Sequence, residues 1–278
     1  MSRADAREGG YQGEPGAYSE RAVRELFPEL RPRPLPSFAR VFEGVEVGAL
    51  AVGVVPIENS YAGSINETYD LLVRHGLEIV GEHIVRISHC LLGSGDLRDV
   101  RTVYSHPQAL AQTAQFIATL GARAVAVEDT AGAARMVAEE GRADAAAVAS
   151  ADAAELYGLR VLAKDIEDRP DNSTKFVVIA RDVVAELGEP DKTSLVFETA
   201  DVPGALHRCL GEFASRGINL SKLESRPSRQ RAWQYHFYVD ITLPRSHPDA
   251  LEALTSLAAH TTFLRVLGSY PSARSATA

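Results

Sequence analysis

Two alternations of apolar runs follow one another along the chain, and they constrain the fold more than any other feature. From about residue 11 to 182, short strand-like runs alternate with helical patterns; the run 49–57, for example, precedes a helical pattern over 65–75. Such alternation is typical of α/β domains with mainly parallel strands. After a Gly- and Pro-containing linker at 188–191, the expected order becomes strand, helix, strand, strand, helix, strand. This order predicts a ferredoxin-like βαββαβ unit.

The patterns also predict individual elements and their ends. Ser64 and Glu67 fit a capping box, and Thr130 is expected to cap an Ala-rich helix that ends at Gly141. The polar ends 1–10 and 272–278 are expected to be disordered tails. Further strands are expected over 77–85, 101–104, 122–128, 145–149 and 174–180, and a further helix over 107–120. In the C-terminal region, strands are expected over 193–199, 218–227, 233–243 and 263–270, and helices over 203–216 and 248–259.

Composition limits the classes of function. The formal net charge of -8 argues against a nucleic-acid-binding protein, which needs a clustered basic face. Cys90 and Cys209 lie far apart in apolar stretches, so we expect two buried free thiols. The N-terminus has no apolar signal region, and no run approaches the roughly 20 apolar residues of a membrane span. We therefore expect a cytoplasmic protein with no membrane partner.

Polar clusters occur where strands are expected to end or helices to begin. Three of them place Ser19, Ser64 and Ser105 near helix starts, where free N–H groups can bind anions. Each serine taken alone is better explained as a simple helix cap. The eight histidines lack metal-ligand spacing, and no Gly-x-Ser-x-Gly elbow or dinucleotide fingerprint is present. The sequence thus predicts neither a metal nor a cofactor.

Taken together and in order, the clusters resemble the signature of the prephenate dehydratase family. The stretches that carry the resemblance are 16–20, 55–60 with 63–68, 105–110 and 174–176. Asp201–His207 resembles the strand-to-helix turn of an ACT domain, a small amino-acid-binding module, and Glu224–Pro227 resembles the second phenylalanine-binding motif of dehydratases. The family usually has arginine where this chain has Lys175, which keeps the charge but loses the bidentate fork.

The resemblance implies a fold, a reaction and a set of site residues. It implies a two-lobed periplasmic-binding-protein-like catalytic domain over 10–187 and an ACT domain over 191–272. The reaction is the conversion of prephenate to phenylpyruvate with loss of water and carbon dioxide. Thr174 would polarise the leaving hydroxyl, and Glu58 is a second candidate for acid chemistry. The implied substrate-binding residues are Ser19, Asn59, Ser60, Ser64, Ser105, Gln108, Lys175 and Phe176.

The resemblance further implies regulation by phenylalanine bound between paired subunits, in a homodimer or homotetramer. The implied effector-binding residues are Gly204, Ala205, Leu206, His207, Asn219, Glu224, Ser225, Arg226 and Pro227. Two alternatives stay open: an arogenate dehydratase, whose substrate carries an amine in place of the keto group, and a non-catalytic small-molecule sensor. The sequence does not tell whether phenylalanine inhibits or activates.

Overall fold

The computed structural model describes the chain except for residues 1–7, 183, 185–186, 229–232 and 274–278. The described residues form two compact units. The first takes the residues up to Leu71 and from His83 to Phe176, and the second takes Leu72–Glu82 and the residues from Val177 onward. The expected domain limits at 10–187 and 191–272 stay predictions. The two units do not coincide with these limits, because the segment 72–82 belongs to the second unit.

The first sheet has the strand order β2-β1-β3-β11-β5, with the short β4 beside β3. β1 pairs in parallel with both β2 and β3, as the alternation predicted. Its strands are β1 (Glu8–Gln12), β2 (Arg31–Leu35), β3 (Val52–Asn59), β4 (Gly63–Ser64), β5 (Glu78–Arg86) and β11 (Ser173–Ala180). The helices between them are α1 (Tyr18–Leu26), α2 (Phe38–Glu46) and α3 (Asn66–Arg74).

Part of the expected N-terminal tail is a strand. Residues 8–10 begin β1, in which Gly9 and Gly10 are buried. A Cβ on Gly10 would lie 2.3 Å from Leu50 Cδ1, and one on Gly9 would lie 2.8 Å from Val23 Cγ1. These glycines therefore serve close packing inside a sheet, although the sequence pattern predicted a disordered tail. Residues 1–7 and 274–278 of the expected tails lie outside the described residues.

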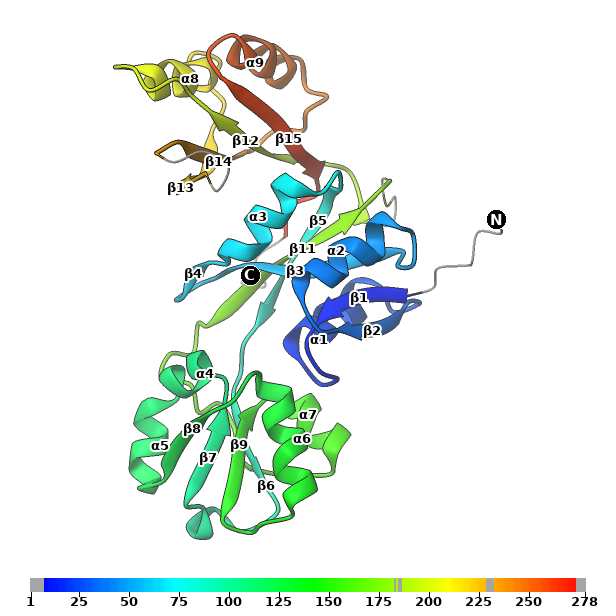
Figure 1. Cartoon of the computed structure of the whole chain (residues 1–278), viewed down its shortest axis with the longest axis vertical. Helices are drawn as coiled ribbons and strands as arrows, with labels where there is room; N and C mark the ends of the chain where they lie inside the picture. Colours follow the sequence, from blue (N-terminus) through cyan, green and yellow to red (C-terminus); the bar gives the residue numbers. More distant parts are fainter. Residues whose placement is uncertain (1–7, 183, 185–186, 229–232, 274–278) are drawn as a thin grey trace. The chain divides into compact units, whose positions relative to one another are not determined.

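The second sheet forms a three-layer α/β/α arrangement (Figure 1). Its order is β10-β6-β9-β7-β8, with β7 parallel to both β8 and β9. Its strands are β6 (Cys90–Gly93), β7 (Thr102–Ser105), β8 (Arg123–Ala126), β9 (Ala145–Ala149) and β10 (Arg160–Ala163). Its helices are η1 (Leu97–Asp99), α4 (Pro107–Gln112), α5 (Ala114–Leu120), α6 (Thr130–Glu140) and α7 (Ala151–Tyr157).

Two expectations about helices in this region were wrong. The helix expected over 107–120 is broken at Thr113, because Asp168 N–H donates to the Gln112 carbonyl at 2.7 Å and Thr113 leaves the helical conformation. The N-cap of α6 is Asp129, whose carboxylate accepts from Gly132 N–H, rather than Thr130. Gly141 does end α6 in the left-handed conformation, with φ 62°.

The C-terminal region forms the predicted βαββαβ unit. Its antiparallel sheet has the order β13-β14-β12-β15, and α8 and α9 cover one face (Figure 1). Phe197, Phe213 and Leu257 are fully buried between them. The elements are β12 (Lys192–Glu198), α8 (Ala205–Ala214), β13 (Leu220–Pro227), β14 (Tyr235–Ile241), α9 (Pro248–Ala258) and β15 (Phe263–Tyr270).

A buried ion cluster joins the segment 72–82 to this C-terminal sheet within the second unit. Lys192 Nζ lies 2.8 Å from Glu82 Oε2 and 2.8 Å from Asp240 Oδ2, and the three side chains are 8%, 5% and 14% exposed. Arg265 donates to the carbonyl groups of residues 73, 75 and 77, at and just beyond the end of α3. Burial lowers the pKa of Lys192, but the carboxylates of Asp240 and Glu82 outweigh it, so this pKa is raised.

Candidate functional site

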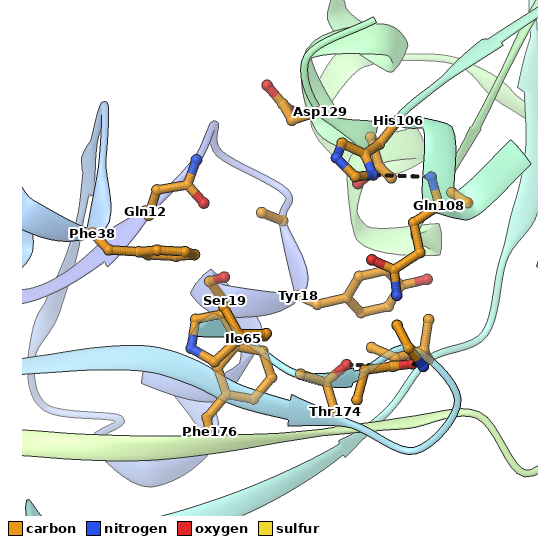
Figure 2. A pocket seen from close by; sticks show the side chains of 18 of the residues that line it. Gln12, Tyr18, Ser19, Phe38, Ile65, His106, Gln108, Asp129, Thr174 and Phe176 are labelled. Atoms are coloured by element: carbon orange, nitrogen blue, oxygen red, sulfur yellow. Dashed lines mark hydrogen bonds between the residues drawn. The ribbon is translucent and has the colours of Figure 1, made fainter. Parts of the chain in front are cut away.

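A cavity with a volume of about 580 Å³ lies in the first unit. In Figure 2, Phe38 and Gln12 lie at the left of this cavity, Tyr18 and Gln108 at the right, and Thr174 and Phe176 below. The lining comes from segments far apart in the sequence, including the ends of β1 and β3 and the start of β11. Such a volume suits a small organic ligand.

Five helices begin at this cavity. Residues at the N-termini of α1, α2, α3, α4 and α6 all belong to its lining. The first N–H groups of a helix have no partner inside the helix, and the helix dipole places roughly half a positive charge there. Ser37, His106 and Asp129 each accept one such N–H at the starts of α2, α4 and α6, and the remaining N–H groups make the cavity suited to bind anionic groups.

None of the described residues that line this cavity is a lysine or an arginine. Its ionisable lining residues include the histidines His89 and His106 and the carboxylates of Glu67, Glu128 and Asp129. The positive potential that a carboxylate ligand needs must therefore come from backbone N–H groups and neutral donors. This distribution differs from the expected lysine–carboxylate contact.

The glycine-bearing loop before α1 is held in place by α7 and by its own helix. Ser150 Oγ donates to Gly16 O at 2.7 Å, and Tyr157 Oη donates to Pro15 O at 2.9 Å. Gly16 N–H donates to the buried Glu20 carboxylate at 2.6 Å, and its φ of 88° favours glycine. These contacts direct the first turn of α1, with Tyr18 and Ser19, toward the cavity.

Thr174 and Asn59 form the central polar contact of the lining. Asn59 Nδ2 donates to Thr174 Oγ1 at 3.1 Å, and both residues line the cavity. Thr174 is only 9% exposed and Asn59 only 5%. Because the Thr174 oxygen accepts from Asn59, its own hydroxyl proton is the one left to donate to a ligand.

The structure brings most of the predicted substrate residues together. Thr174 and Phe176 alternate with Lys175 along β11, and they face the cavity while Lys175 does not line it. The predicted residues in the lining are Ser19, Asn59, Ser64, Gln108, Thr174 and Phe176. Those outside it are Glu58, Ser60, Ser105 and Lys175.

The residues outside the lining have other places in the fold. Ser105 is fully buried and donates to Val148 O at 2.6 Å, so it joins β7 to β9. Ser60 Oγ accepts from Ser173 N–H at 3.0 Å and thereby ties the end of β3 to β11. Glu58 lies in β3 opposite Ser64 of β4. Their predicted roles in substrate contact therefore gain no support from the cavity.

Several lining residues were not predicted. Sequence signals existed for some of them: Tyr18 and His106 lie inside the quoted motifs, and Gln112 follows Gln108 by four residues, on the same helix face. His89 and Phe38 had no such signal. Burial raises the pKa of Tyr18 and lowers the pKa of His89, so both are neutral near pH 7.

A smaller cavity lies in the C-terminal unit and has a volume of about 330 Å³. Four predicted effector residues, Gly204 to His207, line it at the start of α8. Gln234 also lines it, and the buried Gln234 Oε1 has no hydrogen-bond partner within the described residues. The other predicted effector residues lie outside the lining of this cavity: Asn219, Glu224, Ser225, Arg226 and Pro227.

Metal ligands and membrane spans have no counterpart in the described part of the chain. It contains no group of three or more His, Cys, Asp or Glu side chains arranged to hold a metal ion. It also contains no helix of the length and apolar character that crossing a membrane requires. Cys90 and Cys209 are buried free thiols, as expected, and burial raises the pKa of each.

Fold and site together define an α/β protein with a cavity at which five helices begin, followed by a small ferredoxin-like domain. The family model for prephenate dehydratase matches residues 10–183, and that for the ACT domain matches residues 193–259. The chain belongs to the prephenate dehydratase family. The predicted family and fold class are thereby confirmed.

Three similar proteins illustrate the range of the family. "Arogenate dehydratase/prephenate dehydratase 2, chloroplastic" of Arabidopsis thaliana is 46% identical over 273 residues, covering 94% of this chain and 72% of the relative. The solved prephenate dehydratase of Arthrobacter aurescens in complex with L-Phe is 32% identical with a TM-score of 0.86, covering 96% of this chain and 90% of that one. The solved structure of GqqA, described as a novel type of quorum quenching acylase, is 38% identical with a TM-score of 0.87, covering 96% and 98%.

One expectation is corrected by these relatives. The comparison with curated relatives contradicts the predicted cytoplasmic location, because the similar protein from Arabidopsis thaliana is named as chloroplastic. The prediction depended on the missing signal region, and that feature alone does not fix a compartment.

Proposed function

We propose that the larger cavity converts prephenate to phenylpyruvate. The bond between the ring and its carboxylate breaks, and that electron pair enters the ring as the bond to the ring hydroxyl breaks. The hydroxide takes up one proton and leaves as water, while the carboxylate leaves as carbon dioxide and the ring becomes aromatic. Because aromatisation drives the reaction, the protein's main tasks are to orient the substrate and to assist departure of the hydroxyl.

The hydrogen bond from Asn59 to Thr174 is the observation that carries this proposal. It leaves the Thr174 proton as a donor on the cavity wall, where it can polarise the leaving oxygen. An alcohol is a weak acid, so Thr174 acts through a hydrogen bond, and the proton itself comes from water or another group. Glu58 is not favoured as that group, because it does not line the cavity.

Carboxylate binding is assigned to the helix N-termini. Peptide dipoles and neutral donors such as Gln108 hold an anion without a strong ion pair, which suits a carboxylate that must leave as carbon dioxide. The aromatic rings of Tyr18, Phe38 and Phe176 offer apolar walls to the substrate ring. Lys175 has a supporting role at most.

Phenylalanine is proposed as the effector of the ACT domain. Gly204 to His207 supply a helix start for its carboxylate in the smaller cavity, and the Gln234 oxygen suits its ammonium group. The motif at Glu224–Pro227 would contribute from a paired subunit, so we propose a homo-oligomer of at least two chains. Sedimentation in the presence and absence of phenylalanine measures this directly.

An assay for phenylpyruvate released from prephenate, with and without phenylalanine, tests the proposal. Turnover that changes with phenylalanine is the expected result. No turnover on prephenate would remove the proposed activity, and no turnover on arogenate either, together with a normal fold by circular dichroism, would favour the sensor alternative.

Two further substrates belong in the same assay. Arogenate must be compared with prephenate by kcat/KM, because the similar Arabidopsis thaliana protein is named for both activities. An acyl amide substrate must also be included, because the similar GqqA structure is described as an acylase. Faster turnover of the amide than of either ring substrate would replace the proposed reaction by hydrolysis.

A further inference from the structure

A continuous network of side-chain hydrogen bonds runs from Thr174 along the wall of the cavity, which Asn59, Gln112 and His89 also line. Asn59 Nδ2 bonds Asn172 Oδ1 at 2.9 Å, and Asn172 Nδ2 bonds Gln112 Oε1 at 3.0 Å. Gln112 Oε1 also lies 3.0 Å from His89 Nε2. Asn59, Asn172 and His89 are 5%, 1% and 2% exposed and Gln112 is partly buried, so the network is largely buried. Thr174 and His89 are thus the two ends of one buried network.

The direction of every bond follows from the end at Asn59. Its Oδ1 accepts from the backbone N–H groups of Tyr61 at 3.1 Å and Ala62 at 3.0 Å. If the Asn59 amide rotated by 180°, its NH₂ group would face these two N–H donors, so its orientation is fixed. Its Nδ2 is fixed as the donor group, and its two protons serve three acceptors, Asn172 Oδ1, Ser173 O and Thr174 Oγ1, so one proton is shared.

The same argument then fixes the amide orientations of Asn172 and Gln112 and the tautomer of His89. Because Asn172 receives a hydrogen bond at Oδ1, its Nδ2 is the donor toward Gln112. Gln112 must therefore present Oε1, and an oxygen requires a proton on His89 Nε2. The neutral tautomer of His89 that fits is the one protonated at Nε2.

The other contacts of His89 fix the place of its ring. Tyr18 Oη donates to Ser88 O at 2.5 Å and lies 3.4 Å from His89 Nδ1, too long a contact to determine the tautomer. His89 N–H is held by the Glu167 carboxylate at 2.8 Å. Tyr18 and His89 also pack edge to face, with ring centroids 5.9 Å apart. The imidazole is thus held in one place and one orientation.

We propose that His89 is a positioning residue of the dehydration, acting through Gln112, Asn172 and Asn59 on the hydroxyl of Thr174. This inference rests on the proposed function. Gln112 Oε1 is held in place by two donors, His89 and Asn172. When the His89 donor is lost, the amide groups of Gln112 and Asn172 can both rotate by 180°. The NH₂ group of Asn172 then faces the NH₂ group of Asn59. This repulsion between two donors disturbs the hydrogen bond from Asn59 to Thr174, which leaves the Thr174 proton free to donate.

A pair of variants tests the proposal. His89→Phe keeps an aromatic ring beside Tyr18 but removes the donor, whereas His89→Gln places an amide N–H near the position of Nε2. We expect His89→Phe to lower kcat about tenfold, the worth of one lost hydrogen bond, with a much smaller change in KM. His89→Gln should recover most of kcat. Melting temperature and phenylalanine binding show whether each variant is folded.

Several outcomes decide the matter. A folded His89→Phe variant with the kcat of wild type would overturn the proposal, and so would an equal loss in both variants, which would indicate packing alone. Should His89→Phe fail to fold, ¹⁵N NMR of the wild-type imidazole decides: a proton on Nδ1 contradicts the network, and one on Nε2 supports it. Absence of wild-type turnover would instead refute the proposed function, and the tautomer measurement would still test the network.

Discussion

At the scale of single residues, the site depends on the polarity of hydrogen bonds rather than on charge. Asn59 turns a threonine, a poor acid, into a directed donor, and it does so without a lysine or arginine among the described residues of the cavity lining. The sequence motifs identified both Thr174 and Asn59. They could not predict the contact between them, because residues 115 positions apart meet only through the pairing of β3 with β11.

The hydroxyl of Thr174 can be tested by a pair of substitutions. Thr174→Val keeps the shape of the side chain but removes the donor, so we expect kcat to fall by about 10²-fold. Thr174→Ser keeps the donor and should retain much of the activity. Steady-state kinetics on prephenate measures both variants, and a Val variant as active as wild type would exclude the hydroxyl from the reaction.

The buried imidazole of His89 predicts a pH dependence of stability. Burial lowers its pKa below the ordinary 6.5, so the unfolded chain binds this proton at a pH where the folded protein does not. Stability is therefore present above pH 6.5 and falls as the pH drops from 6.5 toward the lower folded pKa, although Gln112 and Glu167 moderate the shift. Urea unfolding between pH 5 and 7.5 should show a steeper loss in wild type than in His89→Gln. Parallel curves would contradict the prediction.

At the scale of elements, long periodic segments were predictable and short or irregular ones were not. The strand β9 was predicted with its observed limits, and the end of α6 at Gly141 was predicted as well. β1, β2 and α2 were not predicted, because Gly9 and Gly10 or the prolines of β2 are typical of loops when read locally. Tertiary packing against Val23 and Leu50 overrides that local preference.

The packing of β1 makes Gly10→Ala a sensitive test. The added Cβ would lie 2.3 Å from Leu50 Cδ1, so Leu50 must move, and we expect a loss of about 1–3 kcal/mol in the free energy of unfolding. Gly211→Ala is the matched control: this glycine lies inside α8 with no atom within 4 Å of an added Cβ. The control should stabilise by about 0.5–1 kcal/mol. Equal effects of the two substitutions in urea unfolding would refute the packing argument.

At the scale of the whole molecule, the order of elements predicted both regions, and the residue contacts add a grouping of the segment 72–82 that the sequence did not suggest. Residues 72–82 group with the C-terminal sheet through Lys192 and Arg265. Neither side chain lies in a recognisable motif. Their role could not be read from the sequence, because it depends on which strands become neighbours after folding.

The ion cluster around Lys192 should contribute strongly to stability. Lys192→Ala leaves the carboxylates of Glu82 and Asp240 buried without their cation, so we expect a loss of about 3–5 kcal/mol. Arg245→Ala removes an exposed partner of Glu78 and should cost less than about 1 kcal/mol. Thermal unfolding of both variants provides the comparison, and similar costs would show that the buried cluster is not special.

The convergence of five helix starts on one cavity has a consequence for evolution and for inhibition. Peptide groups cannot be substituted or deprotonated, so the attraction for carboxylates persists when side chains around it change, and it persists at alkaline pH, where lysine would lose its charge. Substitution of the polar and aromatic residues that line such a cavity can therefore change which acidic metabolite it binds, while the attraction for carboxylates is kept. Competitive inhibitors of the enzyme should accordingly need an acid group more than any particular skeleton.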